Sequence, residues 1–160
     1  MLKFIRNYHG DIQPMSTLTL SFDERARSRQ RVELDNGTQA GLFLSRGTIL
    51  QHDDLLQAES TEVVKIVAAQ ETVSTAKISD LLLLARCSYH LGNRHVPLQI
   101  TAEFIRYQHD HVLDEMLKGL GIVVTVEQAP FEPEAGAYGG QGDSHSHHHS
   151  HEGDEHIHAH

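Results

Sequence analysis

The second half of the sequence carries six apolar segments in an order that strongly restricts the fold. Strand-like runs occupy residues 63–69, 96–100, 103–107 and 122–126, and two stretches with helical spacing lie between them, one over residues 80–91 and one following Asp110. Ser79 or Asp80 can cap the first helix and Gly92 can end it. Asp110 can cap the second helix, and Gly119 or Gly121 can end it. The order β-α-β-β-α-β predicts a ferredoxin-like arrangement.

The first sixty residues have a different pattern, typical of β-structure alone. Residues 16–22 alternate between apolar and polar side chains, which predicts a half-buried strand. Residues 31–34 and 40–44 read as two further strands, joined through Asp35-Asn36-Gly37, and an Asn-Gly pair supplies the positive φ angles of a tight hairpin. The polar stretch 57–61 resembles a linker. We therefore expect an α+β protein with a small all-β module over residues 1–61 and a ferredoxin-like domain over residues 62–138.

Residues 139–160 form a third segment, which is dominated by histidine. Eight of the fourteen histidines fall in the last twenty residues, and no Lys or Arg follows Lys118. A segment rich in imidazole and carboxylate binds divalent transition metals, and too few apolar residues are present to order it, so we expect a disordered metal-binding tail. Purification tags are usually uninterrupted runs, whereas other residues are interspersed among these histidines: His145, His147, His148, His149, His151, His156, His158 and His160.

Composition argues against several classes of function. Residues 1–118 carry thirteen Lys and Arg against fifteen Asp and Glu, and the remaining residues carry seven acidic side chains and no Lys or Arg. Nucleic-acid binding requires a concentrated cationic surface, so no nucleic-acid partner is expected. Residues 1–6 lack the apolar stretch of a secretory signal, and the aliphatic run 81–85 is too short to span a bilayer. We therefore expect a cytoplasmic protein without membrane contact.

Four histidines of the second domain are candidate metal ligands in two pairs. His90 and His95 flank the turn that follows the first helix, and His109 and His111 bring both rings to one face if the backbone between them is extended. Either pair gives too few ligands for a closed site, so water, the tail or a second copy of the chain would complete the shell. Alternatively, His90 interacts with the terminal carbonyls of its helix, and the second pair is simply a solvated strand-to-helix junction.

Three other features have ordinary structural interpretations. Cys87, the only cysteine, lies within an apolar helix and is expected in the core. Arg25, Arg27, Arg29 and Arg31 recur at every second residue, which predicts a solvated face or, alternatively, a patch for an acidic protein. The sequence His109-Asp110-His111 begins like the HxHxDH motif of metallohydrolases, but Leu113 and Asp114 stand where that motif requires Asp and His. No enzymatic activity is therefore predicted.

Several motifs together resemble the UreE family, the urease accessory nickel metallochaperones. They are YHLGNRHVPLQ at residues 89–99, YQHDHVLD at 107–114 and FEPEAGAY at 131–138. Residues 46–48 look like the RG-containing segment of the family's β module, and the histidine-rich tail is typical of many members. The resemblance therefore covers nearly the whole chain. One departure is His52-Asp53-Asp54, which stands where many members have a Gly-Asp pair.

The resemblance implies a nickel carrier that dimerises through its second domain. The first domain would be similar to a peptide-binding domain of a chaperone. His95 matches the interfacial nickel ligand, so that two copies of it would meet across the dimer axis, His109 and His111 match the peripheral metal-binding histidines, and His90 matches a further family histidine. The implied partners are the GTPase UreG and the complex of the urease apoprotein with its accessory proteins.

The expected cargo is Ni(II), which the chain would deliver to urease during active-site assembly, with the tail gathering the ion and the His95 site holding it. Histidine-rich sites also bind Cu(II) or Zn(II) in vitro, and copper more tightly than nickel. The alternative function is a general divalent-metal buffer or storage protein that uses the tail alone.

Overall fold

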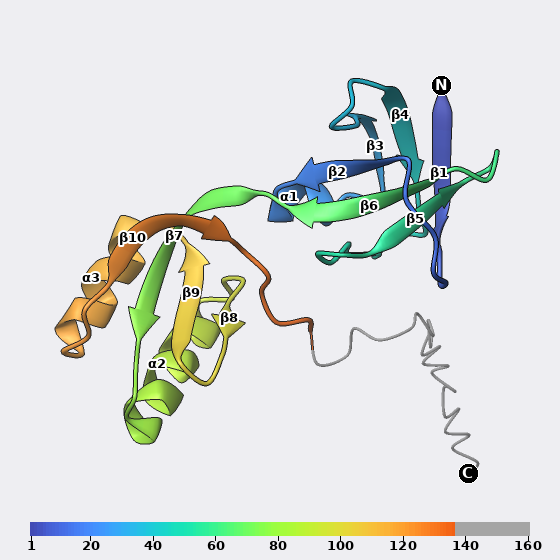
Figure 1. The fold of residues 1–160 in the computed structure, drawn as a ribbon. Coiled ribbons are helices and arrows are strands. Elements are labelled where there is room, and N and C mark those ends of the chain that lie inside the picture. Colours follow the sequence, from blue (N-terminus) through green and yellow to red (C-terminus); the bar gives the residue numbers. More distant parts are fainter. Residues whose placement is uncertain (137–160) are drawn as a thin grey trace, which may run out of the picture.

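The computed structural model describes residues 1–136 and consists of two β-sheets with three helices (Figure 1). It is a mixed α+β structure in which strands predominate. The expected tail and all eight of its histidines lie outside the described residues. Within residues 1–136, no helix has the length and apolar character needed to cross a membrane.

The first sheet has six strands in the order β2-β6-β5-β1-β4-β3. Pairing is parallel between β1 and β4 and between β2 and β6, and antiparallel elsewhere. One core cluster fills this module, and its fully buried side chains include Phe4, Leu42 and Leu56. The strands are β1 (Leu2–Asn7), β2 (Ser16–Leu20), β3 (Arg29–Glu33), β4 (Gln39–Phe43), β5 (Leu55–Ala58) and β6 (Val63–Ala68).

The hairpin predicted from Asn36-Gly37 is confirmed. Strands β3 and β4 pair antiparallel from Arg29 opposite Phe43 to Glu33 opposite Gln39, and Gly37 has a φ of 88°. The preceding Asp35 accepts hydrogen bonds from the hydroxyls of Thr17 (2.5 Å) and Thr19 (2.7 Å) on β2. The turn is therefore fixed both by its own backbone geometry and by a carboxylate that binds a distant strand.

The assignment of residues 63–69 to the second domain is wrong. Strand β6 hydrogen bonds to β2 and β5, so it belongs to the first sheet. The supposed linker 57–61 is the end of β5 and a tight turn, in which the Thr61 amide donates to the Ala58 carbonyl (3.1 Å). The prediction failed because an apolar run identifies a strand but not the strands with which it pairs. The chain passes from the first sheet to the second between Ala68 and Gln70.

The first strand of the second sheet along the chain is β7 (Gln70–Lys77), and not the run 63–69. The sheet has the order β10-β7-β9-β8, and all its pairings are antiparallel. Along the chain the order is β7, α2 (Leu81–Asn93), β8 (Gln99–Ile100), β9 (Phe104–Gln108), α3 (His111–Gly119) and β10 (Thr125–Pro130). The predicted helices are confirmed, with Asp80 and Asp110 as their N-caps.

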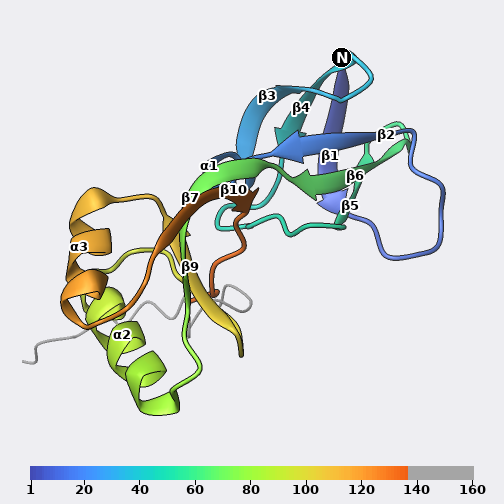
Figure 2. The same cartoon turned by 60° about the vertical axis from the view of Figure 1, so that its left-hand side comes forward.

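Both helices pack on one side of this sheet (Figure 2). Cys87 and Leu91 of α2 share a core with Leu113 and Leu117 of α3 and with Ile105 of β9. Cys87 is completely buried, as expected for a core residue, and burial raises the pKa of its thiol.

The two sheets are joined by more than the chain connection between β6 and β7. Arg25, at the end of the short helix α1 (Phe22–Arg25), is 1% exposed and donates hydrogen bonds to the carbonyls of Leu20, Leu50 and Phe131. Phe131 follows β10, and its ring packs edge-to-face on Phe22 at 5.6 Å. The predicted solvated arginine face is therefore wrong for Arg25, which is a buried contact between the modules, whereas Arg27, Arg29 and Arg31 are exposed.

Asp53, the position at which the sequence departs from the suggested family pattern, has a φ of 71°. The left-handed turn is therefore present without glycine. Lys65 pairs with the Asp53 carboxylate at 3.2 Å, and the neighbouring His52 accepts a hydrogen bond at Nδ1 from the Ala68 amide (3.1 Å). Both contacts join the turn to β6.

Candidate metal centre

His95 lies directly after helix α2 in an unusual backbone conformation. The helix continues past Gly92 to Asn93, Arg94 is its C-cap, and His95 has a φ of 56°. The His95 amide donates to the Gly92 carbonyl (3.0 Å), which completes the helix end. A left-handed conformation costs a non-glycine residue roughly 1–2 kcal/mol. The outlier places an exposed imidazole at the turn, and such strain is frequent at functional positions.

His90 occupies the last turn of α2 and is half-buried. Its ring contacts the ring of Tyr89 edge-to-face, with centroids 5.3 Å apart. This contact neither requires nor prevents metal ligation, so both interpretations of His90 stay open.

His109 follows β9, and its ring contacts two other elements. Its Nδ1 lies 3.1 Å from the Ser74 hydroxyl of β7 and 3.2 Å from Oδ2 of Asp114 on α3. Asp114 is buried, and its Oδ1 accepts a hydrogen bond of 2.6 Å from the Tyr107 hydroxyl. Burial raises the pKa of Tyr107 well above its ordinary value, and the Asp114 carboxylate adds to this effect, so the hydroxyl stays protonated as a donor.

Asp110 and His111 form the start of helix α3. Oδ1 of Asp110 accepts hydrogen bonds from the amides of Val112 (2.8 Å) and Leu113 (3.1 Å), so this carboxylate is engaged as the helix cap. The backbone at Asp110 is extended, with φ −148° and ψ 119°, as the spacing argument for His109 and His111 requires. His111 is the first helical residue and is exposed.

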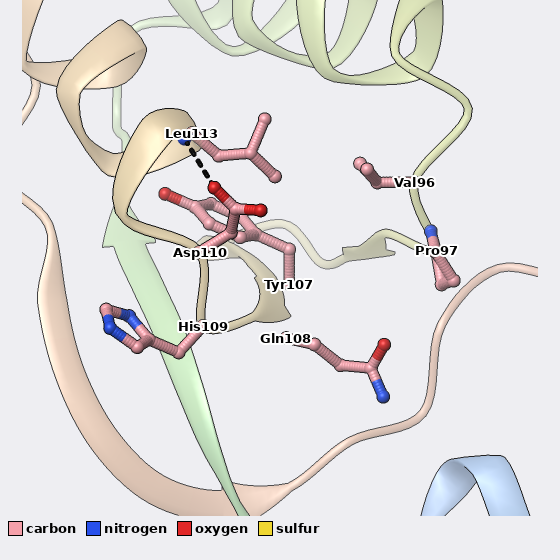
Figure 3. A pocket seen from close by; sticks show the side chains of 7 residues that line it. All are labelled: Val96, Pro97, Tyr107, Gln108, His109, Asp110 and Leu113. Atoms are coloured by element: carbon pink, nitrogen blue, oxygen red, sulfur yellow. Dashed lines mark hydrogen bonds between the residues drawn. The ribbon is translucent and has the colours of Figure 1, made fainter.

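A pocket of about 250 Å³ lies between these two regions (Figure 3). Val96 and Pro97, which follow His95, line one side, and His109 and Asp110 line the other. Tyr107, Gln108 and Leu113 complete the lining. The pocket therefore connects the neighbourhood of His95 with that of His109.

Within residues 1–136, the structure brings together no group of three or more His, Cys, Asp or Glu side chains that would hold a metal ion. The described part of one chain thus supplies isolated imidazoles rather than a closed cage. A closed shell would require further ligands.

The sequence predicts no role for Ser74 or Asp114, although both contact the candidate ligand His109. Ser74 is 35 residues from His109, and only the pairing of β7 with β9 brings them together. Asp114 left a detectable signal, because it lies among the apolar residues of α3, next to Leu113 and three positions before Leu117. A carboxylate on the apolar side of a helix is rarely buried without a partner.

Two family models together cover almost the entire chain. The model for the UreE urease accessory protein, N-terminal domain, matches residues 1–69, and that for the C-terminal domain matches residues 71–160. The chain belongs to the UreE family. The division between the two UreE models coincides with the change of sheet between Ala68 and Gln70.

Curated UreE relatives agree with this assignment. The chain is 61% identical over 135 residues to the urease accessory protein UreE of Vibrio parahaemolyticus, with 84% of this chain and 85% of the relative covered. It is 57% identical over 128 residues to the UreE of Proteus mirabilis, with 80% of each covered. A UreE protein is an accessory factor of urease maturation rather than an enzyme, and the resemblance noted in the sequence is confirmed.

Proposed function

We propose that this chain binds Ni(II) through histidines and delivers it to urease during assembly of the urease active site. The observation that carries the proposal is His95, an exposed imidazole held at a strained φ of 56° beside the pocket that His109 lines. Copper would bind such ligands more tightly, so the choice of nickel rests on the family.

The proposed carrier is a homodimer in which two His95 side chains share the ion. Helix α2 supports this assembly because it exposes large apolar side chains, with Leu81 81%, Leu82 70% and Tyr89 68% exposed. Exposed apolar side chains that recur along one helix favour a protein contact. A second copy would supply the ligands that residues 1–136 of one chain lack.

His109 and His111 are proposed as peripheral metal ligands, with His90 as a further candidate. The tail histidines from His145 to His160 would gather nickel for the interfacial site, since a short tether gives an effective concentration on the order of millimolar. We assign UreG and the urease apoprotein complex as partners and the cytoplasm as the compartment, on the family resemblance.

The second module is proposed to have the ferredoxin-like arrangement, which the order β-α-β-β-α-β and the antiparallel sheet β10-β7-β9-β8 support. We further propose that it dimerises and binds metal, and that the first module acts as a peptide-binding-like domain.

Calorimetric nickel titration combined with sedimentation tests the function. We expect a variant lacking residues 142–160 to bind fewer ions than the full chain but to retain one tight nickel per dimer. His95→Ala in that background should remove this ion, because it removes both copies of the shared ligand. His9→Ala, which alters an exposed histidine of the first module, is the matched control and should leave binding unchanged.

The second candidate function is a metal buffer based on the tail. The absence of a group of three ligand-type side chains within residues 1–136 favours it. If deletion of residues 142–160 abolished all nickel binding, the buffer would become the better account and the interfacial site would be wrong.

A further inference from the structure

Asp114 is a buried carboxylate that contacts one of the proposed nickel ligands. Only 4% of this residue is exposed, and it lies in the first turn of α3. Both of its oxygens have a partner, since Oδ1 accepts from the Tyr107 hydroxyl at 2.6 Å and Oδ2 lies 3.2 Å from Nδ1 of His109. Burying a carboxylate without hydrogen-bond donors costs free energy. Asp114 is therefore the acceptor in both contacts, and Tyr107 and His109 are the donors.

The proton between Asp114 and His109 belongs on the imidazole. An ionised carboxylate can only accept a hydrogen bond, whereas an imidazole nitrogen that carries hydrogen can donate one. A deprotonated Nδ1 would direct its lone pair at the carboxylate oxygen, which is repulsive. The contact therefore selects the neutral tautomer that carries its hydrogen on Nδ1.

Ser74 makes a second contact with the ring. Its hydroxyl oxygen lies 3.1 Å from the same Nδ1 and can accept part of that hydrogen bond. Ser74 itself is completely buried on β7. Strand β7 and helix α3 thus hold Nδ1 of His109 against the protein, and within residues 1–136 the structure gives Nε2 no hydrogen-bond partner.

We propose that Asp114 is a positioning residue for nickel binding, which fixes His109 in the Nδ1–H tautomer and leaves Nε2 as the donor nitrogen. The inference rests on the proposed function, because it presumes that His109 takes nickel. The tautomer of His109 does not depend on a bound metal and can be measured separately. A carboxylate behind a metal-bound imidazole usually improves both its orientation and its basicity.

Asp114→Asn tests the inference with little change in volume. The side-chain carbonyl of the introduced asparagine can still accept from the Tyr107 hydroxyl, which turns the amide N–H₂ toward Nδ1 of His109. An amide donor requires a bare Nδ1, so the hydrogen of the neutral ring should move to Nε2 and block the donor nitrogen. The logic is that of a catalytic triad in which Asn in place of Asp stabilises the wrong histidine tautomer.

The readout is nitrogen-15 correlation spectroscopy of the imidazole rings in the metal-free full chain, recorded at a pH at which the spectrum shows the rings to be neutral. We expect His109 in the Nδ1–H form in the unaltered protein and in the Nε2–H form in Asp114→Asn. Nickel titration of the same samples, followed by paramagnetic broadening of the His109 ring signals, should show about 10–100-fold weaker binding in the variant.

Two control variants separate positioning from folding. Ser74→Ala removes the other partner of Nδ1 and Tyr107→Phe removes the donor to Asp114, but both keep the carboxylate behind His109. Both should therefore retain the Nδ1–H form. If Asp114→Asn failed to fold, the tautomer in the unaltered protein and in these two variants would decide the question.

An Nε2–H ring in the unaltered protein, or an unchanged tautomer in Asp114→Asn, would overturn the inference. If the tautomer switched as expected but nickel left the His109 signals unaffected in the unaltered protein, the positioning contact would stand. The role of His109 as a nickel ligand would then be wrong.

Discussion

At the scale of single residues, His95 combines a backbone conformation suited to glycine with a side chain suited to metal binding. Helices commonly end with glycine in the left-handed conformation at the residue after the C-cap. His95 occupies that position after Arg94 with a φ of 56°. The proposed function therefore accounts for a side chain that the local backbone disfavours.

We expect His95→Gly to be more stable than His95→Ala by about 1 kcal/mol, because glycine adopts the left-handed conformation freely and alanine does not. Both variants lack the imidazole, so both should lose the interfacial nickel to the same degree. Denaturant unfolding of the metal-free proteins measures the difference. Equal stabilities would show that the conformation at residue 95 carries no strain.

Individual site residues differ in how far the sequence predicts them. His95, His109 and His111 stand in recognisable motifs, so the sequence alone proposes them as ligands, and the nickel titrations test that proposal. The contact of Ser74 with His109 depends on the register between β7 and β9, which places Ser74 opposite Tyr107. Such a contact is a product of strand pairing, and no local pattern near Ser74 predicts it.

At the scale of elements, the helices and the β3–β4 hairpin were predictable from local sequence, and the partners of β6 were not. Asp80 and Asp110 cap α2 and α3 as their side chains suggested, because a short carboxylate can bind free amides at a helix start. Strand β6 looked like the start of the second domain, since its apolar run matches either sheet. Its parallel pairing with β2 joins residues 16–20 to 64–68. These residues are far apart in the sequence, so no local pattern specifies the pairing.

We expect Asp110→Ala to lower the free energy of unfolding by about 1 kcal/mol, as the loss of a helix cap usually does. Asp80→Ala on α2 is the matched control and should have a similar effect on stability. Only Asp110→Ala should weaken nickel binding at His109 and His111, because Asp110 connects them. Unfolding curves and residue-resolved nickel titration of both variants check this, and equal binding by the two would contradict it.

At the scale of the whole molecule, Arg25 fastens the first module to the segment that follows β10. Its guanidinium group donates to the carbonyls of Leu20 (3.3 Å), Leu50 (3.1 Å) and Phe131. Burial lowers the pKa of Arg25, while the nearby carboxylates of Glu132, Glu71 and Asp54 oppose that shift and favour its charge. The regular spacing of the arginines concealed this role, because Arg25 belongs to a short helix and not to an extended strand.

We expect Arg25→Met to reduce stability by about 3 kcal/mol, since it leaves buried carbonyls without their donor. Arg27→Met removes the same charge from an exposed position and should change stability by at most about 0.5 kcal/mol. Denaturant unfolding of the two variants measures the difference. A loss in Arg25→Met no greater than that in Arg27→Met would show that the buried contacts are not stabilising.

The contacts of Phe131 and Glu132 have a consequence for how the modules can move. The chain enters the second module between Ala68 and Gln70, and it returns to the first at Phe131, whose ring meets Phe22, and at Glu132, which accepts from the His52 amide (2.9 Å). A unit attached at one point can rotate freely about that point, whereas a second attachment removes most of that freedom. A protease that cut the single connection between β6 and β7 would therefore leave two fragments still bound to one another, with the face that carries His109 in its original orientation.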